Sequence, residues 1–578
     1  MNLRAELERR LSKALEAAGA PQGSPAMVTP AGRPEFGDYQ ANGVMAAAKA
    51  MKTDPRRLAD RVVAAADLSD LAEPVEIAGP GFLNIRLRAD WLARRVGALL
   101  GDGRLGAEKP DHPRIVVVDY SGPNLAKEMH VGHLRSTIIG DALARVLEFV
   151  GHDVRRQNHV GDWGTQFGML IAYLEQREPA GTIGNLELSD LDDFYRQANQ
   201  RFDSDAAFAN LSRQCVVRMQ AGDPDILTKW RAFRQLSLRH AKAVYERLGV
   251  SLAEADVRGE SDFNDDLPRV VADLEAKGLL QESQGAKCVF LSQFTGKDGQ
   301  PLPVIVQKSD EGYLYATTDL AALRYRVREL KADRILYVTD SRQSLHFSQV
   351  FAVARAAGFA PPEVSLEHVA FGTMMGPDRK PFKTRSGDTV KLMDLLDEAE
   401  QRAFDVVSQK NPELPEDRRR DIARTVGIGA VKYADLSQNR TSDYVFSWDK
   451  MLSLEGNTAP YMQYAYARIR SIFRKGELDA VEQAAPRVLI QEPAERLLAV
   501  RLAQFAEAAH AVAADSTPHV LCGYLYDLAG AFMGFYERCP VLTSSEPLRT
   551  SRVALCELTA RTIRTGLGLL GIGVIEQM

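Results

Sequence analysis

The chain has 578 residues, of which 45% are hydrophobic and 26% are charged. This mixture excludes an intrinsically disordered chain, and the length predicts about three domains. A net charge of −5 argues against a protein that coats nucleic acid indiscriminately, although an acidic protein can still carry a basic face that binds RNA.

Residues 1 to about 107 are predicted to form a small α+β unit. Four leucines spaced one helical turn apart form an apolar stripe, which indicates an amphipathic helix rather than a signal peptide: Leu3, Leu7, Leu11 and Leu15. Val75–Ile77 and Phe82–Leu87 are predicted as short strands around a Gly-Pro-Gly turn. The polar stretch 108–113 is predicted to be a linker.

The pattern changes at Arg114, where Ile115–Val118 is a β-branched run typical of a strand buried on both faces. A turn and a long amphipathic helix follow, and Gly151 is predicted to end that helix. Asp153–Asn158 is predicted as the next strand. Strand, helix and strand form the repeating unit of a doubly wound parallel sheet.

Two later segments, Tyr313–Ala316 and Ile335–Val338, are each predicted as a strand that leads into a helix. Residues of about 175–300 are predicted to be insertions that contain helices and a hairpin. From about residue 400 the chain is predicted to be helical to its end, with a boundary at Asn411–Pro415.

The cysteines are scattered singly along the chain: Cys215, Cys288, Cys522, Cys539 and Cys556. They form no zinc-binding pattern, so we predict buried thiols, no zinc site and a reducing compartment. The apolar runs are expected to fall short of the about 20 residues of a transmembrane helix. A cytoplasmic protein with no membrane partner is therefore expected.

The motif His130-Val131-Gly132-His133 stands at the predicted start of the long helix. A helix N-terminus favours phosphate, and two imidazoles one turn apart can donate hydrogen bonds to it. Gly132 leaves room for a ribose or a base. Two unrelated surface histidines are the alternative, but the position directly after a buried strand favours a nucleotide site.

Three runs carry a specific resemblance: DYSGPNLAK at 119–127, HVGHLRSTIIGD at 130–141 and NHVGDWGTQFG at 158–168. They resemble the "HIGH" region of class I arginyl-tRNA synthetases, and the similarity extends over nearly the whole chain. The resemblance implies an α/β fold with a doubly wound parallel-sheet (Rossmann-like) class I catalytic domain at 111–400. It further implies an N-terminal α+β domain at 1–110 that contacts the tRNA elbow and a C-terminal all-α helical bundle at 401–578 that binds the anticodon.

Residue roles also follow from the resemblance. Catalytic residues are predicted to be His130, His133, Lys380 and Lys383. ATP-binding residues are predicted to be Lys127, His130, Gly132, His133, Gly161, Asp162, Trp163 and Gln166. The segment 374–387 matches the family's mobile "KMSKS" loop, but Pro381 and Thr384 stand where its two lysines are expected. Which of Lys380 and Lys383 contacts phosphate therefore stays open.

A guanidinium is best recognised by planar acceptors, above all carboxylates. Asp119 and Asp319 each lie at or just past the end of a predicted strand, where they would suit a cation. Asp319 could equally be a helix N-cap. By resemblance the full arginine pocket comprises Asp119, Ser121, Asn124, Tyr315, Asp319 and Gln343.

A predicted helix carries tyrosines and arginines close together: Tyr461, Tyr464, Arg468, Arg470 and Arg474. Aromatic rings can stack on unpaired bases while arginines contact phosphates. Core tyrosines and a solvated basic face are the alternative. The resemblance favours RNA contact, with tRNA-binding residues predicted to be Phe82, Asn84, Tyr461, Tyr464, Tyr536 and Met578.

The predicted function is therefore that of an arginine–tRNA ligase. It would use ATP with Mg²⁺ to activate L-arginine and transfer it to the terminal adenosine of tRNA, with the histidines, loop lysines and Mg²⁺ stabilising developing phosphate charge. A monomer without a DNA partner is expected. Two alternatives are a nucleotidyl-transferring enzyme without a tRNA substrate, and a catalytically silent synthetase-like RNA-binding protein, which only the irregular 374–387 loop favours.

Overall fold

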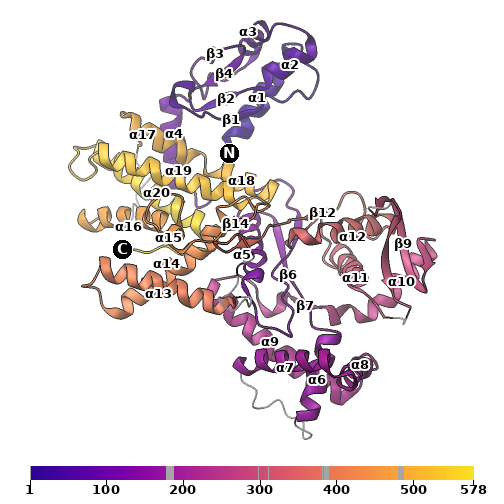
Figure 1. Cartoon of the computed structure of the whole chain (residues 1–578). Coiled ribbons are helices and arrows are strands. Elements are labelled where there is room, and N and C mark those ends of the chain that lie inside the picture. The colour runs from indigo at the N-terminus through magenta and orange to yellow at the C-terminus, as the bar shows by residue number, and fades with distance from the viewer. Residues whose placement is uncertain are drawn as a thin grey trace.

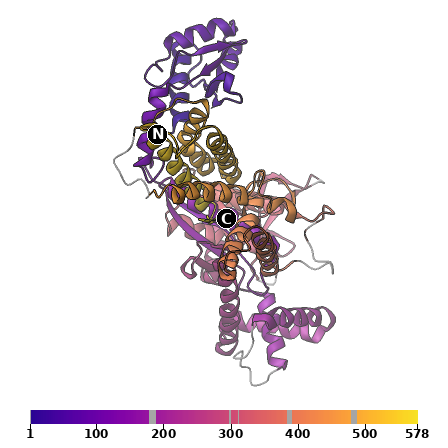
Figure 2. The ribbon, with the colours of Figure 1, turned by 90° about the vertical axis from the view of Figure 1, so that its left-hand side faces the viewer.

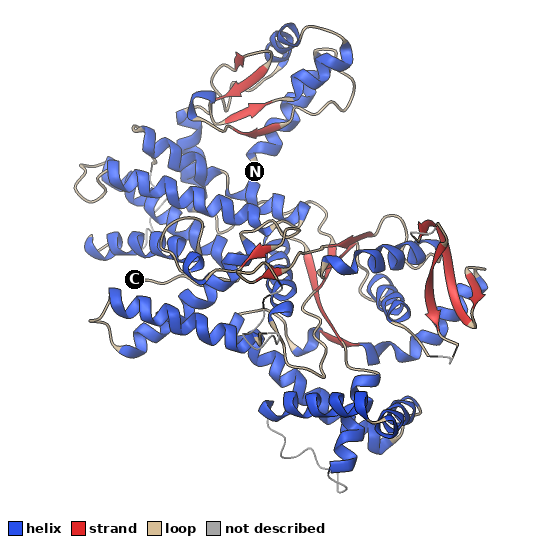
Figure 3. Cartoon of the chain, in the orientation of Figure 1, coloured by secondary structure: helices blue, strands red, loops and turns tan. Residues whose placement is uncertain are grey.

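Figure 1 shows a computed structural model of the chain, which describes residues 2–177, 188–296, 299–309, 312–380, 382, 390–478 and 487–577. The molecule is elongated, with the N-terminal unit at one end, a helical insertion at the other and the parallel sheet between them (Figures 1 and 2). Figure 3 shows that the strands gather in separate groups surrounded by helices.

The N-terminal unit is the predicted α+β structure, and its leucine stripe is buried. It contains α1 (Leu3–Ala17), β1 (Val28–Pro30), η1 (Pro34–Phe36), β2 (Tyr39–Ala41), α2 (Gly43–Met51), α3 (Pro55–Ala65), β3 (Glu76–Ala78), β4 (Phe82–Ile85) and α4 (Ala89–Leu100). The strands pair antiparallel in the order β1-β2-β4-β3. The sequence analysis predicted strands in the regions of β3 and β4 but missed β1 and β2.

Polar contacts fix this unit on the C-terminal helices. Arg496 donates to the carboxylate of Asp38 at 2.5 Å and to the carbonyl of Leu87 at 2.9 Å. The buried hydroxyl of Tyr39 donates to Glu507 at 2.5 Å, and burial raises the pKa of Glu507 to about 7. The N-terminal unit is thus held to the bundle by specific partners rather than by a linker alone.

The central sheet is wholly parallel, with strand order β12-β11-β5-β6-β7. Its strands are β5 (Ile115–Asp119), β6 (Asp153–Val160), β7 (Val257–Gly259), β11 (Arg334–Tyr337) and β12 (Ser365–His368). From β5 the chain builds outward through β6 and β7, and then returns to the other side for β11 and β12. The order reverses beside β5, and such a switch point leaves a ligand crevice at the carboxyl ends of the strands.

Helix α5 (Val131–Phe149) follows β5 and is almost entirely buried. A Cβ atom added at Gly140 would lie 2.2 Å from the Cβ atom of Tyr120. Since that distance is far below a van der Waals contact, only glycine lets α5 lie against the end of β5. The predicted doubly wound, Rossmann-like fold is confirmed.

The insertions consist of helices and an antiparallel sheet, as predicted. They comprise α6 (Thr165–Arg177), α7 (Leu188–Ser204), α8 (Ala206–Gln220), α9 (Pro224–Leu248), η3 (Glu254–Asp256), η4 (Glu260–Asp266), α10 (Leu267–Ala276), β8 (Leu280–Ser283), β9 (Ala286–Thr295) and β10 (Pro301–Gln307). The predicted strand at Tyr313–Ala316 is wrong, because α11 (Tyr315–Arg328) already begins there with Leu314 as its N-cap. An isolated antiparallel bridge joins Tyr313 to Gln307 of β10.

The rest of the chain is largely helical. Its elements are η5 (Ser341–Gln343), α12 (Ser344–Ala356), β13 (Met374–Met375), α13 (Leu392–Lys410), α14 (Glu416–Leu436), β14 (Tyr444–Val445), α15 (Trp448–Met451), α16 (Ala459–Lys475), α17 (Pro493–Ala503), α18 (Phe505–Asp515), α19 (Pro518–Arg538) and α20 (Leu548–Leu569). The expected boundary at 400–401 falls inside α13, and 411–415 connects two packed helices, α13 and α14. The proline-containing segment that the sequence suggested as a boundary forms the connection between two helices.

The five cysteines are free and buried, as predicted. Among the described residues one helical stretch, Pro493–Asp515, is long and apolar enough by composition to cross a membrane, although no apolar run of that length was expected. Its most apolar window is 72% buried inside the protein, as in a core helix of a bundle.

Candidate active site and RNA-binding surfaces

The two motif histidines form the start of α5. His130 is the N-cap, and its Nδ1 accepts a hydrogen bond from the backbone N–H of Gly132 at 3.0 Å. The Nδ1 atom of His133 accepts from the backbone N–H of His130 at 3.1 Å, and the ring centroids lie 4.1 Å apart. Both rings therefore use Nδ1 as an acceptor, which leaves the hydrogen of a neutral ring on Nε2.

Burial and the neighbouring His130 together lower the pKa of His133 to about 3. Burial and Lys127 also lower the pKa of His130. At neutral pH His133 is thus a neutral hydrogen-bond donor. The exposed Gly132 has no room for a side chain, since its Cβ would lie 2.7 Å from the ring of His130.

Two motif segments run side by side next to this helix start. The backbone N–H of Leu125 donates to Gly161 at 2.9 Å, and that of Gly161 donates to Pro123 at 3.1 Å. Lys127 is exposed, with Nζ 4.8 Å above the ring of Tyr195. The Oε1 atom of Gln166 is buried and has no hydrogen-bond partner in the described part of the chain.

Asp162 has a structural role. Its fully buried carboxylate accepts from Arg234 at 2.7 Å and from Ser261, through the backbone at 3.0 Å and the hydroxyl at 2.8 Å. Trp163 packs edge-to-face on Trp230, whose indole donates to the carbonyl of Asp162. The side chain of Asp162 offers no exposed atom to ATP; it fixes the start of η4.

The predicted arginine-pocket residues come from elements that meet at the carboxyl edge of the sheet. Tyr315 and Asp319 lie one turn apart at the start of α11, and Gln343 ends η5 after β11. Tyr315 is 71% exposed, and Asp319 accepts a hydrogen bond from His346 at 2.6 Å. Asp319 is not the N-cap of α11, so that alternative is wrong.

Asp119 already has a guanidinium partner inside the protein. Arg326, which is fully buried, forms an ion pair with Asp119 at 2.9 Å and lies 4.9 Å above the ring of Tyr337. The backbone N–H of His159 also donates to Asp119, at 3.4 Å. The charge of Asp119 is therefore largely compensated, whereas the carboxylate of Asp319 pairs with the imidazole of His346.

Ser121 and Asn124 are tied to the protein as well. Ser121 adopts a left-handed backbone conformation with φ of 71°, and its hydroxyl lies 2.8 Å from the hydroxyl of Tyr245. Thr137 donates to the same oxygen at 2.9 Å. Asn124 accepts from the backbone of Ala126 at 3.1 Å. The hydroxyl of Ser121 is thus engaged inside the protein.

The structure adds Glu260, which the sequence analysis missed. Glu260 begins η4, directly after the carboxyl end of β7. Burial, together with the charges of Asp162 and Asp319, raises the pKa of Glu260 to about 8. Glu260 also contributes to the raised pKa of Tyr315, after burial. No local motif marks this residue, because its neighbours are distant in sequence.

The loop expected to contact phosphates begins as a tight turn. Gly376 donates its backbone N–H to Lys380, and the side chain of Lys380 is exposed. Lys383 lies outside the described residues. The preceding strand β13 pairs with β14, and Phe382 packs against Phe446 at 5.2 Å. The start of the loop is therefore anchored on the helical part of the chain.

The predicted anticodon-binding residues converge although they are far apart in sequence. Arg468 lies between Tyr464 and Tyr536, at 4.9 and 5.1 Å from the two ring centroids. Tyr461 packs against Tyr526 at 5.7 Å. The resulting surface on α16 and α19 combines half-exposed rings with a cation, as RNA stacking requires.

Several other residues predicted to contact RNA already have hydrogen-bond partners inside the protein. Arg470 and Arg474 both hold Glu576 in the C-terminal segment, so their guanidinium groups are partly engaged. Asn84, which lies two residues after Phe82 on β4, is nearly buried and accepts from Gln40 at 2.8 Å. Met578 lies outside the described residues.

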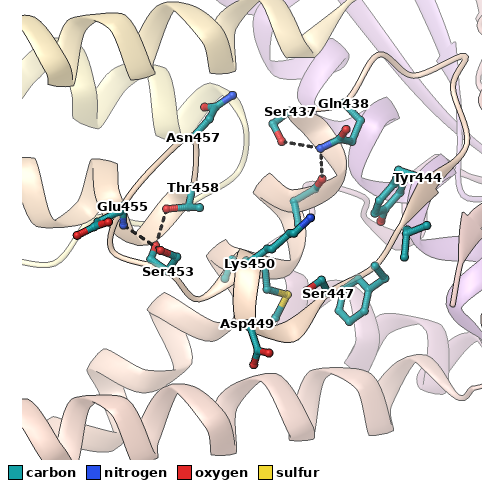
Figure 4. Close-up of a pocket in the computed structure, with 15 residues that line it drawn as sticks. Ser437, Gln438, Tyr444, Ser447, Asp449, Lys450, Ser453, Glu455, Asn457 and Thr458 are labelled. Atoms are coloured by element: carbon teal, nitrogen blue, oxygen red, sulfur yellow. Dashed lines mark hydrogen bonds between the residues drawn. The ribbon is translucent and has the colours of Figure 1, made fainter. Parts of the chain in front are cut away.

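Figure 4 shows a pocket of about 520 Å³ in the helical part of the chain. It is lined by α14, β14, α15 and the turn before α16, and contains none of the predicted site residues. Phe446 forms part of the pocket wall and also contacts Phe382 of the 374–387 loop. The residues predicted to bind ATP and arginine thus gather at the carboxyl edge of the sheet rather than in this pocket.

Comparison with known proteins covers all three parts of the chain. Family models match at residues 5–87 (arginyl tRNA synthetase N terminal domain), 95–448 (tRNA synthetases class I (R), catalytic domain) and 462–578 (DALR anticodon binding domain). The chain is 59% identical to the arginine–tRNA ligases of Hahella chejuensis and Laribacter hongkongensis, over 100% of both chains. The crystal structure of arginyl-tRNA synthetase from Plasmodium falciparum superposes with a TM-score of 0.86 at 29% identity, covering 100% of this chain and 99% of that one.

These matches include the catalytic domain, which excludes the catalytically silent RNA-binding protein as a description of this chain. The match to an anticodon-binding domain argues equally against a nucleotidyl-transferring enzyme without a tRNA substrate. The chain belongs to the arginyl-tRNA synthetases, the class I arginine–tRNA ligases.

Proposed function

We propose that this ligase activates arginine with ATP, to give arginyl-adenylate, at the carboxyl edge of the central sheet. The observation that carries the proposal is the presence of two complementary chemistries at that edge. Neutral imidazole donors at the start of α5 suit phosphate, and the carboxylates of Asp319 and Glu260 suit a guanidinium.

ATP would lie over the start of α5, against Gly132 and the 161–166 loop. His130 and His133 would donate Nε2–H hydrogen bonds to phosphate oxygens, while Lys127 and Lys380 supply positive charge. Mg²⁺ enters with ATP as part of the substrate. The arginine carboxylate attacks the α-phosphorus, the bond to the β-phosphate breaks and diphosphate leaves, so catalysis consists of positioning and charge stabilisation.

Arginine would lie with its guanidinium between α11 and η4. Asp319 and Glu260 would accept its N–H groups, and Tyr315 and Gln343 would line the entrance. Asp119 would contribute a partly compensated carboxylate, and Ser121 would shape the turn after β5. Lysine lacks the planar fork of donors, so it would leave these acceptors mispaired.

The two outer parts of the chain would hold tRNA. Phe82 and Asn84 suit the elbow, and the surface of Tyr461, Tyr464 and Tyr536 suits anticodon bases. The terminal adenosine 2′-OH would then attack the adenylate carbonyl and release AMP. We place the enzyme in the cytoplasm as a monomer, without DNA or membrane partners, and infer that tRNA binding orders the site before activation.

Arginine-dependent ATP–diphosphate exchange tests this function. We expect exchange with arginine only when arginine tRNA is present, and none with lysine under either condition. A folded protein that exchanges with neither amino acid, with tRNA present, would contradict the proposed site. Equal exchange with and without tRNA would instead remove the tRNA-ordered step.

Arginine affinity is expected to rise with pH up to about pH 8. Empty Glu260 has a pKa of about 8 and is mostly protonated at neutral pH, whereas a bound guanidinium favours its ionised form. Binding therefore releases a proton, and affinity rises at most about tenfold per pH unit below that pKa. Calorimetric titration of arginine in two buffers of different ionisation enthalpy measures the proton; E260Q should release none, and equal heats in both buffers for the unmodified enzyme would refute the linkage.

A further inference from the structure

A histidine outside every predicted motif touches the proposed guanidinium acceptor. The Nε2 atom of His346, on α12, lies 2.6 Å from the Oδ2 atom of Asp319, on α11. Because an ionised carboxylate is only an acceptor, the imidazole must carry hydrogen on Nε2 and donate it. Gln343 precedes His346 by three residues, so one segment supplies both a pocket residue and this contact.

We propose that His346 is a positioning residue for arginine selection, which holds the carboxylate of Asp319 in the orientation that receives a guanidinium. The inference rests on the proposed arginine pocket. With Oδ2 occupied by His346, the orientation of the carboxylate is fixed and Oδ1 remains for the substrate. A preoriented acceptor binds more tightly, because less rotational freedom is lost on binding.

The surroundings of the His346–Asp319 pair suit a positioning role better than a purely structural hydrogen bond between two helices. His346 is 33% and Asp319 is 18% exposed, so the pair lies at the wall of an accessible site rather than in the core. The ring of His346 packs edge-on against Phe347 at 5.3 Å. Glu260 and Arg326 act on Asp319 electrostatically from η4 and α11, so His346 completes the ring of groups around one carboxylate.

His368 offers a matched control. Its ring stacks on the same Phe347, at 5.1 Å, but its Nε2 atom lies 2.8 Å from the hydroxyl of Thr339 instead of Asp319. Both histidines therefore contact the same aromatic ring, one edge-on and one stacked, and only His346 contacts the pocket carboxylate. A substitution that acts only through lost contact with Phe347 should therefore have a similar effect at His346 and at His368.

The test compares full-length H346L, H346Q, H368Q and D319N by ATP–diphosphate exchange with arginine tRNA present. H346L should raise the KM for arginine on the order of tenfold, with kcat and the KM for ATP nearly unchanged, as expected for a lost hydrogen bond to a charged group. H346Q should restore most of the affinity, because its amide N–H can reach the same oxygen. H368Q should leave the KM for arginine unchanged.

Three outcomes decide between the possibilities. An increase in the KM for arginine in H346L and D319N, with rescue in H346Q, supports the positioning role. An increase in D319N without one in H346L overturns the role of His346 and leaves the pocket intact. No increase in D319N overturns the proposed pocket and with it the role of His346. A thermal melting temperature equal to that of the unmodified enzyme verifies that each variant is folded.

Discussion

Replacing Asp319 with asparagine is expected to lower kcat/KM for arginine roughly 10²-fold, mainly by raising the KM. The change removes the charge that a guanidinium recognises and leaves the side chain the same size. His346 donates to one oxygen of Asp319. The same donor would hold the single carbonyl oxygen of asparagine and turn the amide N–H₂ toward the substrate. A donor would then face the guanidinium donors, so the loss exceeds that of simple neutralisation.

The measurement is the arginine dependence of ATP–diphosphate exchange with tRNA present, at saturating ATP. D340N is a matched control, because Asp340 caps η5 nearby and pairs with the exposed Arg342, and asparagine preserves such a cap. D340N should leave the KM for arginine nearly unchanged. Equal arginine kinetics for D319N and D340N would remove Asp319 from the pocket. A D319N loss confined to the KM for ATP would do the same.

Much of the fold could be predicted because local patterns carried it. The β-branched run at Ile115–Val118, the long apolar stripe that follows it and the stop at Gly151 define one strand–helix unit that the structure reproduces. The leucine stripe of α1 was equally clear. Each of these elements owes its conformation to a period or a stop signal in the sequence itself.

The errors have a common physical cause. Tyr313–Ala316 has strand-forming residues, yet the chain begins α11 there because the helix can bury Leu320 and Leu323 against its neighbours. Tertiary packing overrode local preference. The boundary expected at 411–415 stays a prediction; that segment connects α13 and α14, whose contact no local signal reveals.

The site likewise has features that local sequence could mark and features that depend on distant residues. Motifs marked His130, His133 and the 161–166 loop, since those residues are adjacent in sequence. The electrostatic role of each residue depended on distant partners instead. Arg326 compensates Asp119, and burial together with the charges of Asp162 and Asp319 raises the pKa of Glu260. Sequence spacing contains no information about these contacts, which form only when the sheet brings its loops together.

Replacing His133 is expected to slow arginyl-adenylate formation on the order of 10²–10³-fold, as for the loss of one donor that stabilises a transition state. Two substitutions separate the two functions of the ring. Alanine removes both the Nδ1 acceptor for the backbone of His130 and the Nε2–H donor. Asparagine can keep the acceptor near the Nδ1 position, so its defect isolates the donor. H133Q, whose amide N–H extends to the Nε2 position, should recover part of the rate.

Single-turnover adenylate formation measured from pH 6 to 8 identifies the form of His133 that acts. Because its pKa is about 3, the ring stays neutral throughout this range, and its protonation should add no acid limb to the rate. A rate that falls as the pH rises through about 6 in the unmodified enzyme, but not in H133N, would mean that His133 works as a cation. Equal rates for H133N and the unmodified enzyme would remove the Nε2–H donor from the mechanism. A neutral donor pair at a helix start would favour the transition state through fixed dipoles, and leave the positive charge to the lysines and to the ion that ATP brings.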